Sequence, residues 1–162
     1  MADIQTIHAF LKASGLAHEI VACDPDDAET AVFAAKYGYS LDCSANCILV
    51  KTKTGATKFV ACVVLATTRL DVNKRVRKLL GARKVSFAAP EDTRRLTGMD
   101  LGGVTPLCLP DDLPVWIDAA VMGRETIILG GGDRHSKIIV APGIFDQVPN
   151  VEVIDGLALA IG

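Results

Sequence analysis

The sequence predicts a single α+β domain, residues 1–162, with a mixed or mostly antiparallel sheet. Half of its residues are hydrophobic but only 5% are aromatic, which indicates an aliphatic core of useful size. Short β-rich runs alternate with helical patterns, and two of those runs flank a turn that contains Gly55, which is typical of an antiparallel hairpin. No internal repeat or linker divides the chain.

Apolar residues at helical spacing predict five helical segments. Glycine stops and capping residues set their ends: Gly15 follows the first segment, the acidic turn at 24–27 precedes the second, Asp71 caps the third and Pro90 opens the fourth. The predicted segments span residues 4–14, 28–37, 71–80, 90–96 and 142–147.

Runs of branched apolar residues bounded by turn residues predict the strands. These runs cover residues 18–22, 47–53, 58–66, 114–118, 125–129, 136–141 and 151–154. The two runs around Gly55 form the hairpin, and glycine-rich loops lie at 97–106 and 130–134.

The net charge of −2 conceals an uneven distribution. Residues 1–45 hold seven acids against two bases, whereas residues 69–84 hold seven bases against one acid. A local excess of this kind can neutralise phosphates and gives salt-dependent binding to nucleic acid. The alternative is the ordinary solvated face of an amphipathic helix.

Several classes of protein are disfavoured. No apolar run approaches the ~18 residues of a membrane span, and the acidic N-terminus is unlike a signal peptide, so we expect a soluble cytoplasmic protein. The five cysteines are an odd number without regular spacing, which indicates reduced thiols. No ligand pattern completes a zinc site, and we expect no metal or organic cofactor.

The loop from Gly102 to Pro106 has neither a dinucleotide fingerprint nor a P-loop ending. Such a loop can instead aim backbone N–H groups at a carbonyl oxygen, the alternative being a pair of tight turns. No G-x-S-x-G elbow indicates a serine triad. Asp118, at a predicted strand end, could bind loop amides, act on water or be purely structural.

The order of motifs along the chain resembles the YbaK/aminoacyl-tRNA synthetase-associated domain family, over residues 4–155. The motifs are Asp27-Ala28-Glu29-Thr30-Ala31, the hairpin, Leu70-Asp71, Leu96-Thr97-Gly98, Gly102-Gly103-Val104-Thr105-Pro106, Ile117-Asp118 and Gly130-Gly131-Gly132-Asp133-Arg134. Members of this family, including free-standing relatives of the prolyl-tRNA synthetase editing domain, hydrolyse the ester of a wrong small amino acid on tRNA.

The resemblance implies a barrel-like sheet with flanking helices, a small pocket at one edge and no cofactor. It implies that the loop Gly102, Gly103, Val104, Thr105 and Pro106 holds the substrate carbonyl while a water attacks, helped by the terminal ribose hydroxyl. The implied substrate-binding residues are Thr30, Cys47, Asp118, Gly131, Gly132 and Arg134. The implied tRNA contacts are Lys74, Arg75, Arg77 and Lys78, and the implied partners are mischarged tRNA and a synthetase.

One position departs from the family pattern. A lysine is expected at the start of the first hairpin strand, where this chain has Cys47. Lys51 shares its strand face but lies ~13 Å further along. Three alternatives therefore remain beside deacylation by water: a non-catalytic aminoacyl-tRNA or nucleotide-binding module, a thiol nucleophile, and hydrolysis of another small ester or amide.

Overall fold

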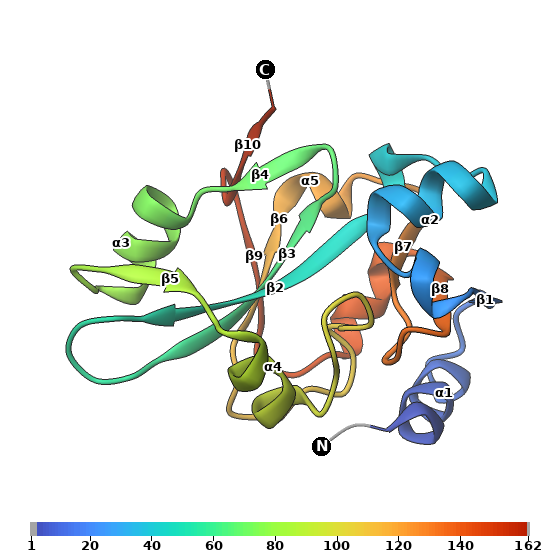
Figure 1. Ribbon diagram of the computed structural model, residues 1–162, viewed down its shortest axis with the longest axis horizontal. Helices are drawn as coiled ribbons and strands as arrows, with labels where there is room; N and C mark the ends of the chain where they lie inside the picture. The colour runs from blue at the N-terminus through green and yellow to red at the C-terminus, as the bar shows by residue number, and fades with distance from the viewer. Residues whose placement is uncertain (1–2, 162) are drawn as a thin grey trace.

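A computed structural model describes residues 3–161 (Figure 1). Its strands are β1 (His18–Ala22), β2 (Ala45–Thr52), β3 (Phe59–Leu65), β4 (Thr68–Leu70), β5 (Val85–Phe87), β6 (Val115–Asp118), β7 (Ile127–Gly130), β8 (Ser136–Val140), β9 (Val151–Ile154) and β10 (Ala158–Ala160). Its helical segments are α1 (Ile4–Ala13), η1 (Pro25–Asp27), α2 (Thr30–Tyr37), η2 (Leu41–Cys43), η3 (Val72–Val76), α3 (Arg77–Leu80), α4 (Pro90–Thr97), α5 (Ala119–Met122) and η4 (Pro142–Gln147). None of these helices is long and apolar enough to cross a membrane.

The strands form three sheets. The largest has the order β5-β2-β3-β6-β9, a second has the order β1-β8-β7, and β10 pairs with β4 alone. The β3–β6 and β6–β9 pairs are parallel and the other pairs are antiparallel. The predicted α+β class with a mixed, mostly antiparallel sheet is confirmed, although the strands described here do not close into one barrel.

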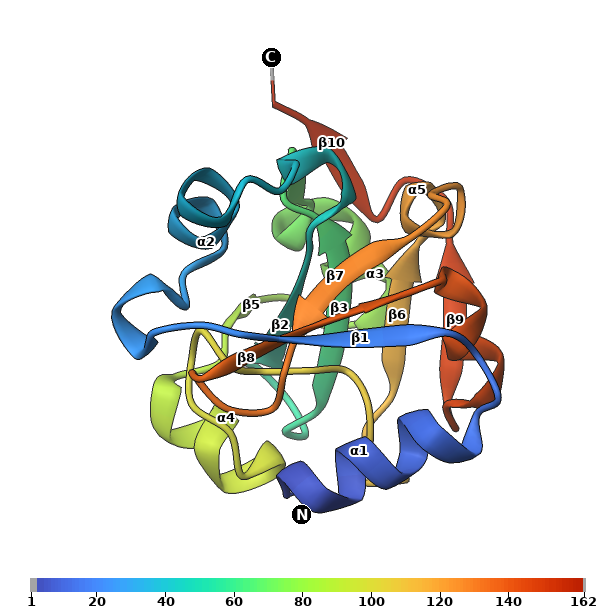
Figure 2. The ribbon, with the colours of Figure 1, turned by 90° about the vertical axis from the view of Figure 1, so that its right-hand side faces the viewer.

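The five-stranded sheet lies between two apolar layers, which explains the continuous apolar run of β3. One face packs against α1 and the three-stranded sheet, whose strands cross in front of it in Figure 2. The other face packs against η3, α3 and β4. Adjacent residues of β3 belong to opposite cores: Val63 lies in the first and Cys62 in the second.

The predicted helix at 71–80 begins with a π-helical turn. The Val76 amide donates to the Asp71 carbonyl five residues earlier, at 3.0 Å, and the Asp71 carboxylate caps the Lys74 amide at 3.3 Å. Regular α-helix follows from Arg77 until Gly81, which adopts a left-handed φ of 65°.

Candidate functional site

A cavity of about 380 Å³ opens between α2, the start of β2 and the two glycine-rich loops. Its wall comes from segments that are far apart in the sequence. They are residues 29–31 and 45–48, Leu101, Gly102 and Val104, with Leu41, Ala66, Gly130 and Lys137.

The two glycine-rich loops contact each other through their main chains. The Gly132 amide donates to the Gly103 carbonyl at 2.8 Å. A Cβ atom on Gly103 would overlap the main chain of Asp133, and a Cβ atom on Gly130 would overlap the Val104 carbonyl. Only glycine permits this approach, so both loops need glycine for packing as well as for turning.

Arg134 joins the first glycine loop to the segment before α2. Its guanidinium donates to the Leu101 carbonyl at 2.6 Å and to the Pro25 carbonyl at 2.7 Å. Gly102, with a φ of 89°, lies directly against this guanidinium and has no room for a side chain. Arg134 therefore fixes the loop that carries the cavity wall.

Two amides of the first loop remain available to a ligand. The Gly103 amide donates to the Asp100 carbonyl at 2.9 Å, and the Thr105 amide contacts the Met99 sulfur at 3.5 Å. Within residues 3–161, the amides of Gly102 and Val104 have no protein acceptor. These two residues are also the members of the predicted loop that line the cavity.

Lys137 is a cavity residue that the sequence analysis did not identify. It is only 5% exposed, and its Nζ donates to the Ala28 carbonyl at 2.6 Å and the Gly102 carbonyl at 3.0 Å. Burial lowers the pKa of this ammonium. A lysine within the apolar run of β8 was the available signal, because a charge in a buried strand is unusual.

Cys47 lines the cavity as a neutral thiol. Burial raises its pKa to about 12, so almost none is thiolate near neutral pH. Lys51, four residues further along β2, does not reach the cavity: its Nζ pairs with Asp92 of α4 at 3.1 Å. The lysine expected at this position therefore has no replacement on β2.

A hydrogen bond joins the start of α2 to β2 inside the cavity. The Thr30 hydroxyl donates to the Asn46 side-chain oxygen at 2.5 Å, and both residues line the wall. Thr30, a predicted substrate-binding residue, thus lies in the cavity wall where α2 meets β2.

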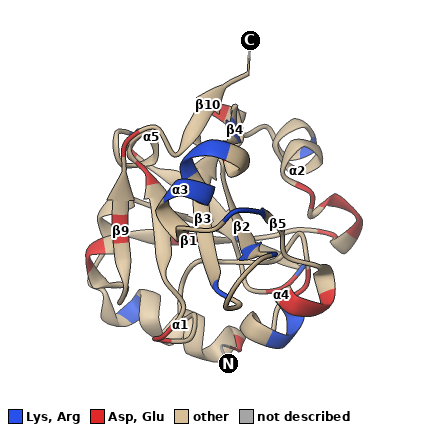
Figure 3. Ribbon diagram, turned by 90° about the vertical axis from the view of Figure 1, so that its left-hand side faces the viewer, with Lys and Arg blue, Asp and Glu red and all other residues tan. Residues whose placement is uncertain are grey.

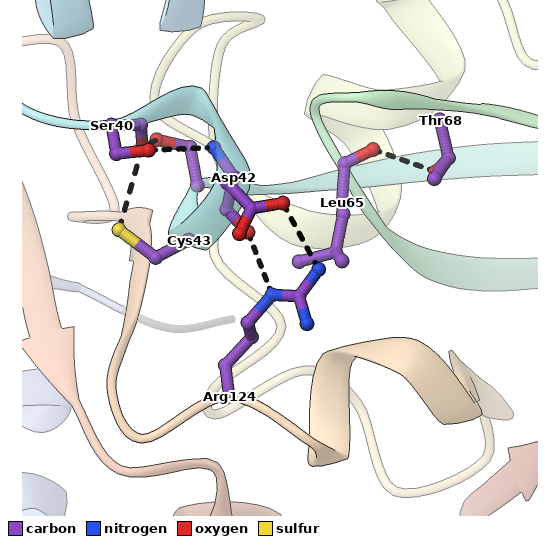
Figure 4. A network of polar contacts seen from close by, with 7 residues as sticks. Ser40, Asp42, Cys43, Leu65, Thr68 and Arg124 are labelled. Carbon is purple, nitrogen blue, oxygen red and sulfur yellow. Dashed lines mark hydrogen bonds and ion pairs between the residues drawn. The ribbon is translucent and has the colours of Figure 1, made fainter. Parts of the chain in front are cut away.

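A polar network holds the wall beside Leu41 (Figure 4). Arg124 donates to the Asp42 carbonyl at 2.9 Å and to its carboxylate at 3.0 Å, while the Asp42 amide donates to the Ser40 hydroxyl at 3.1 Å. Next to it, the Thr68 hydroxyl donates to the Leu65 carbonyl at 2.7 Å, in the turn that contains Ala66. These bonds fix η2 and the β3–β4 turn.

The predicted site residues fall into three groups. Thr30, Cys47, Gly102 and Val104 line the cavity, whereas Gly103, Gly132 and Arg134 fix its loops. Thr105 and Pro106 are buried behind the wall, and Gly131 packs against Ser136.

Asp118 and the basic residues lie elsewhere. The buried Asp118 carboxylate accepts from the Leu157 amide at 3.1 Å and the Ala158 amide at 3.3 Å, so it secures the turn before β10. Lys74, Arg75, Arg77 and Lys78 lie on η3 and α3, on the face shown in Figure 3 and at the opposite end of the molecule from α2.

Relatives in sequence are distant and match only part of the chain. One is "Uncharacterized protein YwhH" of Bacillus subtilis (strain 168), 30% identical over 80 residues, which are 49% of this chain and 50% of that protein. Another is "Putative Cys-tRNA(Pro)/Cys-tRNA(Cys) deacylase EbsC" of Enterococcus faecalis (strain ATCC 700802 / V583). It is 28% identical over 95 residues, which are 59% of this chain and 56% of that protein. The matched region thus spans about half the length of each relative.

Solved structures share the fold over almost their whole length. A crystal structure of "a putative trans-editing enzyme for prolyl tRNA synthetase" has a TM-score of 0.78 at 22% identity, covering 98% of this chain and 97% of that one. The crystal structure of "hypothetical protein APE2540" has a TM-score of 0.81 at 24% identity, covering 94% and 99%.

The family assignment rests on a match along most of the chain. Residues 24–146, about three quarters of the sequence, match the aminoacyl-tRNA editing domain family. This segment contains every residue that lines the cavity. The chain belongs to the aminoacyl-tRNA editing domain family.

Proposed function

We propose that residues 1–162 act as one editing domain that hydrolyses the ester bond of a mischarged small amino acid on tRNA. Membership of the editing family and the likeness to EbsC support this activity. The observation that carries it is the pair of unpartnered amides, of Gly102 and Val104, in a cavity lined by short side chains such as Ala45 and Ala66. The cytoplasm, where tRNA is charged, is the expected location, and a synthetase is a candidate partner.

The two amides suit the carbonyl oxygen of an ester. Attack by water on the carbonyl carbon places negative charge on this oxygen, and preorganised N–H donors stabilise that charge. The bond from the carbonyl carbon to the ribose oxygen then breaks, and the leaving oxygen takes a proton. The terminal ribose hydroxyl assists the water, since the Cys47 thiol is held neutral and is a poor nucleophile.

Deacylation of a panel of tRNAs, mischarged with alanine, serine, cysteine or threonine, tests this proposal. We expect at least one ester to be hydrolysed above the buffer rate. The variant Gly102→Ala should lose most of that rate, because a side chain at a φ of 89° is strained and its Cβ atom would displace the Arg134 guanidinium that fixes the loop. Gly143→Ala, where a Cβ atom meets nothing within 4 Å, should not lose it. Rates equal to buffer for every ester would refute the proposal.

The second candidate is a non-catalytic aminoacyl-tRNA or nucleotide-binding module, favoured by Cys47 where a lysine is expected. This candidate predicts salt-dependent tRNA binding without turnover. It also predicts that Cys47→Lys gains hydrolytic activity, while Cys43→Lys, at a partly exposed position outside the cavity wall, does not.

A further inference from the structure

Lys137 is a buried cation without a carboxylate partner. Within residues 3–161, no carboxylate lies within 4 Å of its Nζ. Its charged and titratable neighbours are Arg134 and the Cys23 thiol, and Glu29 and Cys47 line the same cavity. Burying an unpaired charge costs stability, so this lysine is an expensive residue for a purely structural position.

The fold gives the Lys137 side chain a defined path to the cavity. In the β7–β8 pair Lys137 lies opposite Gly130, which has no side chain to obstruct it. Its Nζ lies 5.8 Å from the centre of the Phe33 ring of α2, between the Ala28 and Gly102 carbonyls. The ammonium therefore bridges the segment before α2 and the first glycine loop.

Two hydrogen bonds of the Lys137 ammonium to the protein leave its third N–H group without a protein acceptor within residues 3–161. An ammonium has three N–H groups, and two are taken by the Ala28 and Gly102 carbonyls. Lys137 and Gly102 both line the cavity, and the Lys137 Nζ lies 3.0 Å from the Gly102 carbonyl. The ammonium is therefore adjacent to the loop whose Gly102 and Val104 amides have no protein acceptor within residues 3–161.

We propose that Lys137 is a further substrate-contacting residue of this cavity, donating its third N–H to the carbonyl oxygen of the bound aminoacyl ester. This inference rests on the proposed deacylase function. The other two N–H groups hold the loop, so a single side chain fixes the Gly102 main chain and supplies a cation next to it. Water attacks the carbonyl carbon, and the carbonyl oxygen becomes an oxyanion bound by Lys137, Gly102 and Val104. The carbonyl then re-forms as the ester bond to the ribose oxygen breaks, and the proton that the water loses passes to that ribose oxygen.

Kinetics of Lys137→Met, Lys137→Arg and the matched control Lys12→Met test this contact on the tRNA that the wild type deacylates. Lys12 lies exposed on α1 and does not line the cavity. We expect Lys137→Met to lower kcat/KM by about 10²- to 10³-fold, because the lost donor contacts the carbonyl oxygen of the bound ester and binds the oxyanion more strongly. Lys137→Arg should keep part of this rate, and Lys12→Met all of it. A Lys137→Met rate within threefold of wild type would overturn the inference.

A pH profile separates contact from mere support of the loop. The charged form of Lys137 donates, so the wild-type rate, corrected for spontaneous hydrolysis, should fall at alkaline pH. Lys137→Arg should lack this fall, because a guanidinium stays protonated. Cys23→Ser should retain it, since the neighbouring thiol is not its source. The same alkaline fall in Lys137→Arg would contradict the proposed contact.

Binding of an amide-linked aminoacyl adenosine, which cannot be hydrolysed, keeps this inference separate from the proposed function. If the wild type deacylates no tRNA, the deacylase proposal fails on its own. The contact then still predicts at least tenfold weaker binding of this analogue by Lys137→Met, measured by calorimetry. Equal binding by both proteins would overturn the contact as well.

Discussion

Position 103 requires glycine because the main chain of Asp133 lies against it. A Cβ atom there would overlap the main chain of Asp133, which cannot move away as a flexible side chain can. We expect Gly103→Ala to lower the free energy of unfolding by about 1–3 kcal/mol and to reduce deacylation, because it separates the two loops. Urea denaturation measures the first effect.

The control for this substitution is Gly143→Ala. A Cβ atom at Gly143 meets no atom within 4 Å, and its φ is not positive. Its unfolding free energy should stay within about 1 kcal/mol of wild type. Equal destabilisation by both substitutions would show that the contact between the loops is not the cause.

The Cys47 thiol should be chemically inert. Its pKa of about 12 leaves roughly one molecule in ten thousand as thiolate at pH 8. Cys43 and Cys47 are both partly exposed, but burial raises the pKa of Cys47, so brief treatment with iodoacetamide followed by peptide mass spectrometry should find Cys43 modified well before Cys47. Unfolded protein should react at both.

The same argument applies to the reaction. Under the proposed function, in which water attacks the ester, the variant Cys47→Ala should deacylate within threefold of wild type. Complete loss of activity together with early alkylation of Cys47 would instead identify a nucleophilic cysteine.

Among the elements, α2 and the turn before it depend on one buried carboxylate. Asp27, whose side chain is 8% exposed, pairs with Lys36 at 2.9 Å and accepts from the Tyr37 hydroxyl at 3.1 Å. Lys36, followed by Tyr37, lowers the pKa of Asp27 below its ordinary 3.8. Since Thr30 and Glu29 of the cavity lie between these residues, the pair supports the wall.

This pair makes a prediction about pH. A carboxylate with a lowered pKa stabilises the fold above its ordinary pKa, and that contribution is lost as the pH falls through 3.8 and below. Asp27→Asn and Lys36→Met should both show a smaller loss of unfolding free energy between pH 6 and pH 3 than the wild type. Denaturation curves at the two pH values measure this, and an unchanged difference would contradict it.

The elements also show what the sequence could predict. Helix α1, strand β1 and the hairpin follow from periodicity, a glycine stop and a turn, so their bounds agree to within a few residues. Strands β4, β5 and β10 have three residues each, which is too short for any period to appear, and the parallel pairing of β6 depends on contacts between distant segments.

The candidate site divides in the same way. The glycine loop and Cys47 could be found from local motifs, and the cavity includes them. Lys137 could be noticed only as a charge within an apolar strand. Its place in the site depends on the carbonyl groups of Ala28 and Gly102, which are distant in sequence and become its neighbours only in the folded chain.

At the scale of the whole molecule, the basic face and the cavity are separate. In Figure 1, α3 lies at the opposite end of the molecule from α2, which borders the cavity. A tRNA that uses both would therefore lie across the molecule, with its stem on the basic face and its 3′ end in the cavity. Under the proposed function, the two contacts can be changed independently.

Charge reversal at Lys74 and Lys78, both exposed, tests this separation. The double variant K74E/K78E should bind tRNA more weakly, and the slope of log Kd against log salt should be shallower by about 1–2, because each phosphate contact contributes roughly 0.7–0.9. Hydrolysis of a short aminoacyl adenosine should not change. K12E, on α1, is the matched control, and equal weakening by it would refute a specific basic face.

The scattered origin of the cavity wall matters while the protein is being made. Wall residues run from Glu29 to Lys137, so an incomplete chain on the ribosome has no cavity until β8 has emerged and paired with β7. At about 5–20 residues per second, the interval between synthesis of the first and the last wall residue is several seconds or more. Under the proposed function, the unfinished protein therefore cannot deacylate tRNA during this interval.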